Sequence, residues 1–185
     1  ETDAVYAENS YCRVDASDLT DGPHNLALYV EDNLGYHIEE STTIYIDRTP
    51  PVVEAWDITP AKWNHETEAT LSWQDVMDET SGLKEIKYQI DEEDAVSLSL
   101  QENGEAIVDT SSLADGEHTF TFAVTDQAGV TIEYTETLYI DRTPPTIEEA
   151  SVLPNTWADT NTLEVLWKEA ADAHSGLNAV EYSLD

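Results

Sequence analysis

The chain has 185 residues, and 40 Asp and Glu against seven Lys and Arg give it a formal net charge of −33. A field of that sign repels nucleic acid and anionic membrane surfaces, so we expect neither as a partner. A hydrophobic content of 40%, with five Trp and nine Tyr, argues against a disordered acidic chain. No apolar run approaches the length of a bilayer span, and we expect no membrane insertion of this segment.

The excess of carboxylates has two physical interpretations. Repulsion among so many like charges destabilises a compact chain unless cations neutralise part of it. The acids therefore form specific sites for divalent cations, or they coat a diffusely solvated surface that suits a salty environment. The two interpretations are compatible.

Nearly all of the chain between residues 52 and 140 has the pattern of β-strands and turns. Apolar residues alternate with polar ones, as in half-buried strands, and no segment has a helical period. The expected strands are, in chain order, 52–56, 69–73, 86–90, 96–100, 106–108, 120–124 and 131–140. Short antiparallel strands of this number predict a two-sheet sandwich. We expect Trp73 and Trp167 to face its core and Trp56 to be partly exposed.

A seven-residue motif, Tyr-Ile-Asp-Arg-Thr-Pro-Pro, occurs as Tyr45–Pro51 and again as Tyr139–Pro145, an offset of 94 residues. The same offset places Trp63 on Trp157 without a gap. A fixed period of this length is the size of one small β-sandwich. The sequence therefore predicts an all-β protein of tandem antiparallel β-sandwich repeats of 94 residues.

This period divides the chain into three parts, with incomplete half-domains at both ends. Residues 51–145 make one complete repeat, residues 1–50 match its C-terminal half, and residues 146–185 match its N-terminal half. A half-sandwich exposes strand edges and an apolar face. Two explanations stay open. The sequence is a slice of a longer array, or half-domains of different chains complete one another head to tail and generate a filament.

Acidic residues gather in the loops at the end of the sandwich where its first strand begins. We expect Asp47, Asp78 and Asp126 to converge on the junction before the complete repeat, and Asp141 with Asp172 on the junction after it. Several carboxylates at one place are typical of a Ca²⁺ site. The candidate ligands are Asp47, Asp75, Asp78, Glu79, Asp126, Asp141 and Asp172. The alternative is that each Asp only caps its own turn through backbone amides.

Two proline-rich linkers separate the three parts. Consecutive prolines favour an extended backbone, so the linkers should hold adjacent repeats apart with limited swing. The linker residues are Thr49, Pro50 and Pro51, and then Thr143, Pro144 and Pro145. Arg48 and Arg142 precede them, and we expect these arginines to pair with carboxylates in loops of the neighbouring repeat. The alternative is that both are solvated.

No arrangement typical of catalysis is present. The chain has no Ser-centred elbow, Gly-rich phosphate loop or Cys/His metal spacing, so we expect no enzymatic activity. His24 and His118 each follow an Asp-Gly turn and are expected to hydrogen-bond at strand ends, and the lone Cys12 is expected to line a core. Trp63 and Trp157 give an alternative function, a carbohydrate- or ligand-binding adhesion module in which exposed indole rings stack on the ligand.

Two motifs resemble bacterial and archaeal immunoglobulin-like surface repeats. One is Asp-Gly-x-His-x₅-Val-x-Asp-x₂-Gly over Asp115–Gly129, followed by Ile-Asp-x-Thr-Pro-Pro over Ile140–Pro145. The other is Ser-Gly-Leu-x₂-Ile-x-Tyr-x-Ile-Asp over Ser81–Asp91. The Ala-Gly-Asn that is usual in the last hairpin turn of that family is Ala-Gly-Val here, ending at Val130, which weakens any transfer of ion ligands from this turn.

The resemblance implies an immunoglobulin-like fold and an extracellular role, as in stalks, adhesins, surface-layer proteins or fibres. Some members of such families bind Ca²⁺ at domain junctions. On this basis we expect a non-enzymatic structural repeat at the cell surface or in a secreted filament. Its expected partners are copies of itself or neighbouring repeats, head to tail, together with other cell-surface components.

Overall fold

The computed structural model describes residue 11 and residues 13–184, and Cys12 lies outside the described residues. The described chain is all β, with antiparallel strand pairing throughout its sheets. It contains no helix of the length and apolarity that a membrane span needs. The strands are β1 (Gly22–Glu31), β2 (His37–Ile46), β3 (Val52–Thr59), β4 (Glu68–Met77), β5 (Leu83–Ile90), β6 (Val96–Ser97), β7 (Gly104–Asp109), β8 (Gly116–Asp126), β9 (Thr131–Ile140), β10 (Glu149–Leu153) and β11 (Glu164–Lys168).

Strands β3 to β9 form two sheets that pack face to face as in a β-sandwich. One sheet has the order β3-β4-β7 and the other has the order β6-β5-β8-β9. Each of the seven strands expected between residues 52 and 140 has a counterpart, although the one expected at 96–100 is only Val96–Ser97. The alternating pattern is also confirmed, because the inward positions of β4 and β8 are buried and supply one core cluster to which both sheets contribute.

Aromatic side chains fill the space between the two sheets. Trp73, Phe120 and Phe122 are all fully buried, and burying each contributes roughly 1.5–3 kcal/mol. Trp56, which was expected to be partly exposed, is half-buried and stacks on Phe122 with ring centroids 5.8 Å apart. β7 closes over Trp73 at Gly104, where an added Cβ would lie 2.2 Å from the indole ring. The absence of a side chain at this glycine therefore makes room for the largest core residue.

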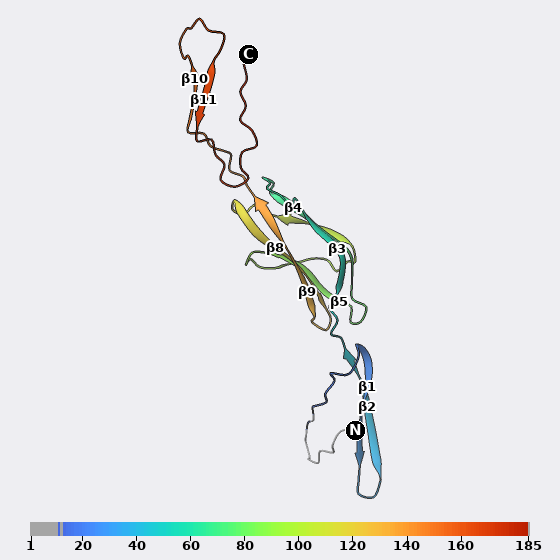
Figure 1. The fold of residues 1–185 in the computed structure, drawn as a ribbon. Coiled ribbons are helices and arrows are strands. Elements are labelled where there is room, and N and C mark those ends of the chain that lie inside the picture. The colour runs from blue at the N-terminus through green and yellow to red at the C-terminus, as the bar shows by residue number, and fades with distance from the viewer. Residues whose placement is uncertain (1–10, 12, 185) are drawn as a thin grey trace.

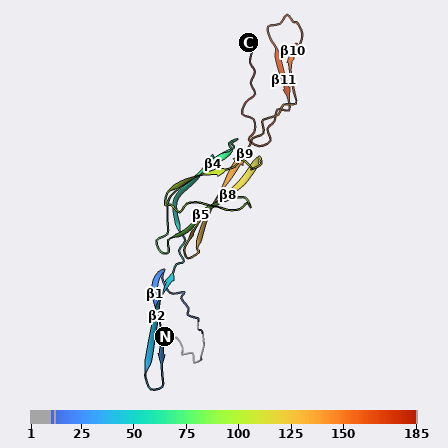
Figure 2. The ribbon, with the colours of Figure 1, turned by 180° about the vertical axis from the view of Figure 1, so that it is seen from behind.

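The remaining strands form two hairpins that lie at opposite ends of the molecule. β1 pairs with β2, and β10 pairs with β11. Figures 1 and 2 show β3 to β9 between the two hairpins, which point away from each other. Trp167 on β11 was expected in a core, and this prediction is wrong for the single chain, because its hairpin has no second sheet to cover it and the side chain is half-exposed.

The arginine before each linker binds backbone of its own unit. The Arg142 guanidinium donates to the carbonyl oxygens of Leu113 and Thr110, each at 2.9 Å, and Arg48 donates to the matching carbonyls of Leu19 and Ala16. The expectation that these arginines pair with carboxylates of a neighbouring repeat is therefore wrong. Carbonyls of the preceding loop are nearer, and binding them fixes the direction in which the chain leaves each hairpin.

A group of hydrogen bonds, called here the Asp91–His118 tie, joins the end of β5 to the start of β8. The Thr119 amide donates to Asp91 Oδ1 at 2.8 Å, and His118 Nδ1 lies 2.7 Å from Asp91 Oδ2. His118 Nε2 lies 2.9 Å from the Ala114 carbonyl oxygen. His24 makes the matching contact, 2.7 Å from the Thr20 carbonyl oxygen. Both histidines therefore hydrogen-bond at strand ends, as predicted.

The tie is pH-sensitive because both partners titrate. Burial lowers the pKa of His118, but its bonds to Asp91 and Ala114 and the charge of Asp91 outweigh burial, so the pKa is raised. The bond to His118 lowers the pKa of Asp91, with burial opposing and the Thr119 amide assisting. A raised histidine pKa stabilises the fold fully below the unfolded value of about 6.5, and this stabilisation is lost as pH rises through the folded value.

We predict that raising the pH from about 6 to about 9 lowers the free energy of unfolding by about 1 kcal/mol more in the wild type than in His118→Gln. Urea unfolding of both proteins at each pH measures this difference, and the substitution serves as the control for every other titrating group. Equal pH dependence in the two proteins would show that the His118–Asp91 pair contributes nothing.

Candidate cation site at the junction of β2 and β3

Three aspartates meet where the chain passes from the first hairpin into the central sandwich. Asp47 follows the last residue of β2, Asp78 follows the last residue of β4, and Asp126 is the last residue of β8. One carboxylate oxygen from each lies within 4.8 Å of the other two. The group therefore draws one ligand from the hairpin side of the linker and two from the sandwich.

Each carboxylate uses one oxygen to shape its own turn. Asp126 Oδ1 accepts from the amides of Gly129 and Val130 at 2.7 and 2.8 Å. Asp78 Oδ1 accepts from the amide of Gly82 at 2.8 Å and from two further amides before it. Asp47 Oδ1 accepts from the Thr49 amide at 3.2 Å. Local capping, which was the alternative to ion binding, is therefore present, but it occupies only Oδ1.

The second oxygens of two of these carboxylates are buried without a partner. Asp47 Oδ2 and Asp126 Oδ2 have no hydrogen bond within the described chain, and the whole Asp126 side chain is 0% exposed. Leaving a charged oxygen in this state is unfavourable, because it loses water and gains nothing in exchange. Asp126 is one of only two buried polar residues of the described chain. A water molecule or a cation is the kind of partner that would satisfy its second oxygen.

Repulsion between the three charges adds to this penalty. Two carboxylates at the 4.8 Å limit repel by about 3 kcal/mol at an effective dielectric constant of 20. None of the ion pairs formed by the described residues includes Asp47, Asp78 or Asp126. A cation is the kind of ligand that both satisfies the free oxygens and cancels the repulsion.

The donor set fits a hard cation. All three side chains offer oxygen, and Ca²⁺ binds six to eight oxygens from carboxylates, carbonyls and water, whereas soft metals prefer sulfur and nitrogen. Three carboxylates supply part of such a shell, and carbonyl oxygens or water would supply the rest. The residues present are therefore compatible with Ca²⁺ and would hold it through Asp47, Asp78 and Asp126.

Two of the predicted ligands lie apart from this group. Asp75 and Glu79 are both exposed. The Asp75 amide donates to Asn103 Oδ1 at 3.0 Å, and its backbone has a φ of 49°. Asp75 lies within β4 and Glu79 directly follows Asp78, yet neither belongs to the three-aspartate group.

The junction after the sandwich has a related but different arrangement. Asp141 Oδ2 accepts from the Ser175 amide at 2.9 Å, and hydrogen bonding by Ser175, first through its side chain and then through its amide, lowers the pKa of Asp141. Asp172 Oδ1 accepts from the Gly176 amide at 2.8 Å, in the same way that Asp78 caps its loop. Within the described chain no third carboxylate joins these two. The second junction thus has two of the three equivalent acids.

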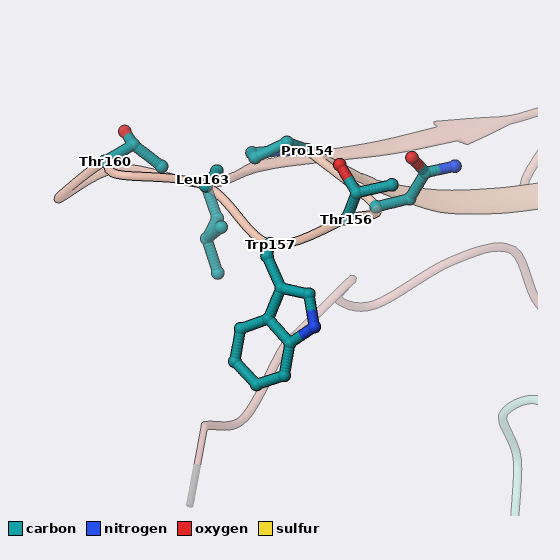
Figure 3. A pocket seen from close by; sticks show the side chains of 7 residues that line it. Pro154, Thr156, Trp157, Thr160 and Leu163 are labelled. Carbon is teal, nitrogen blue, oxygen red and sulfur yellow. The ribbon is translucent and has the colours of Figure 1, made fainter.

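The two tryptophans that were singled out for ligand stacking have different surroundings. Trp63 lies against Tyr139 and His174, with ring centroids 5.2 and 5.7 Å away, so part of its ring contacts protein. Trp157 is fully exposed. In Figure 3 its indole projects away from the loop that carries Pro154 and Thr156, beside Leu163. Of these two rings, only that of Trp157 is free to stack on a ligand.

Sequence reasoning missed Asn64 and His174, which join the sandwich to the segment after it. The Asn64 amide donates to the Tyr139 carbonyl at 3.0 Å, and the Asn64 carbonyl accepts from the Asp141 amide at 2.9 Å. The 94-residue offset carries no signal for either residue, because it pairs Asn64 with Ala158 and His174 with Thr80.

We predict that the effect of Asp126→Asn on stability changes sign with Ca²⁺. Asn keeps the acceptor for Gly129 and Val130 but removes one charge. Without Ca²⁺ the variant should be as stable as the wild type, or more stable by about 1 kcal/mol, because repulsion is relieved. With Ca²⁺ at about 100 times its dissociation constant, the wild type should gain about 2.7 kcal/mol and the variant much less.

Urea unfolding in EDTA and in Ca²⁺ measures both differences, with isothermal titration calorimetry to report binding directly. Asp75→Asn is the matched control, because it removes an exposed charge close by in sequence. If Asp126→Asn and Asp75→Asn respond to Ca²⁺ alike, the three-aspartate group is not the binding site.

Comparison with known proteins assigns no family to the chain. Neither a protein-family model nor a curated protein sequence matches it. The function is therefore argued from the geometry of the junction and from the contacts on either side of it.

Proposed function

We propose that the chain is a non-enzymatic structural spacer made of tandem immunoglobulin-like β-sandwich repeats, with a Ca²⁺ ion stiffening the junction between repeats. The observation that carries this proposal is the three-aspartate group, because its ligands come from both sides of a linker. An ion bound by Asp47 on one side and by Asp78 and Asp126 on the other would resist bending between them.

The strand order of the central sandwich supports the immunoglobulin-like assignment. The orders β3-β4-β7 and β6-β5-β8-β9 correspond to strands A-B-E and C′-C-F-G of such a fold. In this proposal residues 51–145 are one complete repeat. Residues 1–50 are the C-terminal half of another repeat, and residues 146–185 are the N-terminal half of a third.

Contacts that recur at the 94-residue offset support equivalent junctions. The Thr143 hydroxyl donates to Asp115 Oδ2, and the Thr49 hydroxyl donates to Asp21 Oδ2 at 2.6 Å. The bond from Thr143 is the first cause of the lowered pKa of Asp115. Each linker is therefore tied to the loop before it, and two prolines then restrict its backbone. Such a linker transmits orientation from one repeat to the next.

The charge of the chain fits an environment that supplies cations. With a net charge of −33, adjacent repeats repel one another, and a cation at the junction lowers that repulsion where the repeats are closest. Extracellular Ca²⁺ modules commonly bind at about 10⁻⁴–10⁻³ M, which suits sites with few protein ligands. Together with the resemblance to immunoglobulin-like surface repeats, this favours an extracellular location, on the cell surface or in a secreted filament.

We predict that Ca²⁺ narrows the distribution of orientations between the first hairpin and the sandwich. Spin labels at Glu39→Cys and Glu133→Cys, in a Cys12→Ser background and diluted with unlabelled chain, report the distance between the two parts by pulsed electron paramagnetic resonance. The distribution should be narrow in Ca²⁺ and broad in EDTA, and Asp78→Asn should keep it broad in both. A width that does not change with Ca²⁺ contradicts a junction stiffened by the ion.

A carbohydrate-binding adhesion module is the second candidate, and the exposure of Trp157 favours it. Aromatic faces that are open to solvent provide stacking surfaces for flat ligands. We predict that Trp157→Ala lowers any binding to immobilised polysaccharides at least tenfold, whereas Trp63→Ala, at a ring that already contacts protein, leaves it largely unchanged. Pull-down on a polysaccharide panel measures this, and binding that survives Trp157→Ala removes the candidate.

A further inference from the structure

The two terminal hairpins expose apolar faces at positions that are buried in the sandwich. Leu28 on β1 is 62% exposed, and Phe122, which lies 94 residues later on β8, is 0% exposed. Trp167 on β11 is 53% exposed, and Trp73 on β4 is 2% exposed. The same contrast holds for a set of apolar residues on each hairpin. The exposed members are Leu26, Leu28 and Val30 on the first hairpin and Val152, Val165 and Trp167 on the second.

These two faces correspond to surfaces that contact each other in the same molecule. β1 and β2 occupy the positions of β8 and β9, and β10 and β11 occupy those of β3 and β4. In the sandwich, the sheet that contains β3 and β4 covers the sheet that contains β8 and β9, with Trp73 against Phe122 at a centroid distance of 6.0 Å. The first hairpin therefore has the shape and polarity that would cover the second.

An aromatic pair at the edge of the sandwich shows the same contrast between contact in the sandwich and exposure at the ends of the chain. Trp63 and Tyr139 pack with ring centroids 5.2 Å apart. Their counterparts at the 94-residue offset are Trp157, which is fully exposed, and Tyr45, which is 79% exposed. One half of a pair that is formed in the sandwich is thus present at each end of the chain.

The incomplete junction after the sandwich lacks an acid that the first hairpin carries. Asp141 and Asp172 match Asp47 and Asp78, so the missing ligand is the counterpart of Asp126. Asp32, which directly follows β1, is that counterpart. Its Oδ1 accepts from the amides of Leu34 and Tyr36 at 2.8 and 2.9 Å, which repeats the turn that Asp126 forms.

The two hairpins of one chain are too far apart to meet. Figures 1 and 2 place β1–β2 and β10–β11 beyond opposite ends of the sandwich, with the whole of β3 to β9 between them. A two-stranded hairpin with one apolar face is marginally stable alone. Within the described residues neither hairpin can therefore cover the other, and a second copy of this chain carries a face that fits each of them.

We propose that residues 13–46 of one chain pack on residues 146–184 of a second copy, in the arrangement that joins β8–β9 to β3–β4 in the sandwich. Asp32 of the first chain would then join Asp141 and Asp172 of the second copy as the third carboxylate of a cation site. This proposal rests on the proposed function, since it treats both hairpins as parts of the same kind of repeat. The two faces differ, so the contact is head to tail and generates an open filament.

The test uses two variants of the 185-residue chain, each with one blocked end. Leu28→Asp places a charge on the face of the first hairpin, and Trp167→Asp does so on the second. Sedimentation velocity over a range of concentrations should show association of the wild type beyond its 20.6 kDa chain mass. Each variant alone should stay monomeric. Their equimolar mixture should form a dimer and nothing larger. The unsubstituted second hairpin of Leu28→Asp can pair with the unsubstituted first hairpin of Trp167→Asp, and no other pairing is left.

Ser41→Asp is the matched control on the first hairpin. Ser41 pairs with Ala27 and not with Leu28, so it lies on the opposite face of the hairpin, and its counterpart Thr135 is exposed in the sandwich. This variant should associate like the wild type. Association that survives Leu28→Asp, or that is lost in Ser41→Asp, assigns the contact to another surface and overturns the proposal, as does a wild type that stays monomeric at every concentration.

Thermal unfolding of each variant shows whether the sandwich remains folded, so that loss of association is not mistaken for unfolding. With Ca²⁺ at about 1 mM, adding Asp32→Asn to the Trp167→Asp chain should weaken its dimer with the Leu28→Asp chain at least tenfold. Equal dissociation constants with and without Asp32→Asn would remove Asp32 from the contact. Failure of this proposal is distinct from failure of the proposed function. If the chain is monomeric but its first junction still binds Ca²⁺ through Asp126, the head-to-tail contact is contradicted and the proposed spacer function is not.

Discussion

A sheet with one apolar face has to be covered, and this constraint governs each part of the molecule. In the centre the requirement is met, since the three-stranded and four-stranded sheets close on Trp73, Phe120 and Phe122. In the two hairpins the same alternation of residues leaves Leu28 and Trp167 in solvent. The difference between a buried core and an exposed face therefore depends on which strands are present to pair, because the local pattern is the same in both.

The junction depends on a second property: the two oxygens of each carboxylate have different roles. One oxygen of Asp47, Asp78 or Asp126 binds backbone amides and so fixes the turn, and this also fixes where the other oxygen points. Turn capping and ion binding are therefore successive uses of the same side chain. The two interpretations that the sequence left open are therefore compatible, and ion binding stays a proposal. Acids at turns elsewhere in the described chain form no such group. They cap in the same way, but no three of their carboxylates lie close enough together to form a second group.

Much of the fold could be predicted because it depends on features that a sequence displays. Alternation predicted the seven strands, and the sandwich topology predicted that Asp47, Asp78 and Asp126 share one end of the sandwich. The partners of Arg48 and Arg142 were mistaken, because a guanidinium binds whichever acceptors the loops bring near, and here these are carbonyls. The fit of Gly104 under Trp73 and the bonds of Asn64 were likewise out of reach, since both need three-dimensional proximity between residues that no periodicity links.

Covering an apolar face and completing a cation site are coupled through one residue. Asp126 is the last residue of β8, so it reaches the junction only if β8 packs in register with the rest of its sheet. A bound ion would stabilise that register, and correct packing would in turn assemble the ion's ligands. Asp32 directly follows β1, so its position likewise depends on how β1 packs. A contact that covered the exposed face of the first hairpin would therefore deliver its carboxylate to the place where Asp141 and Asp172 lie. In a chain with a net charge of −33, this coupling would let the supply of cations decide how firmly successive units are held.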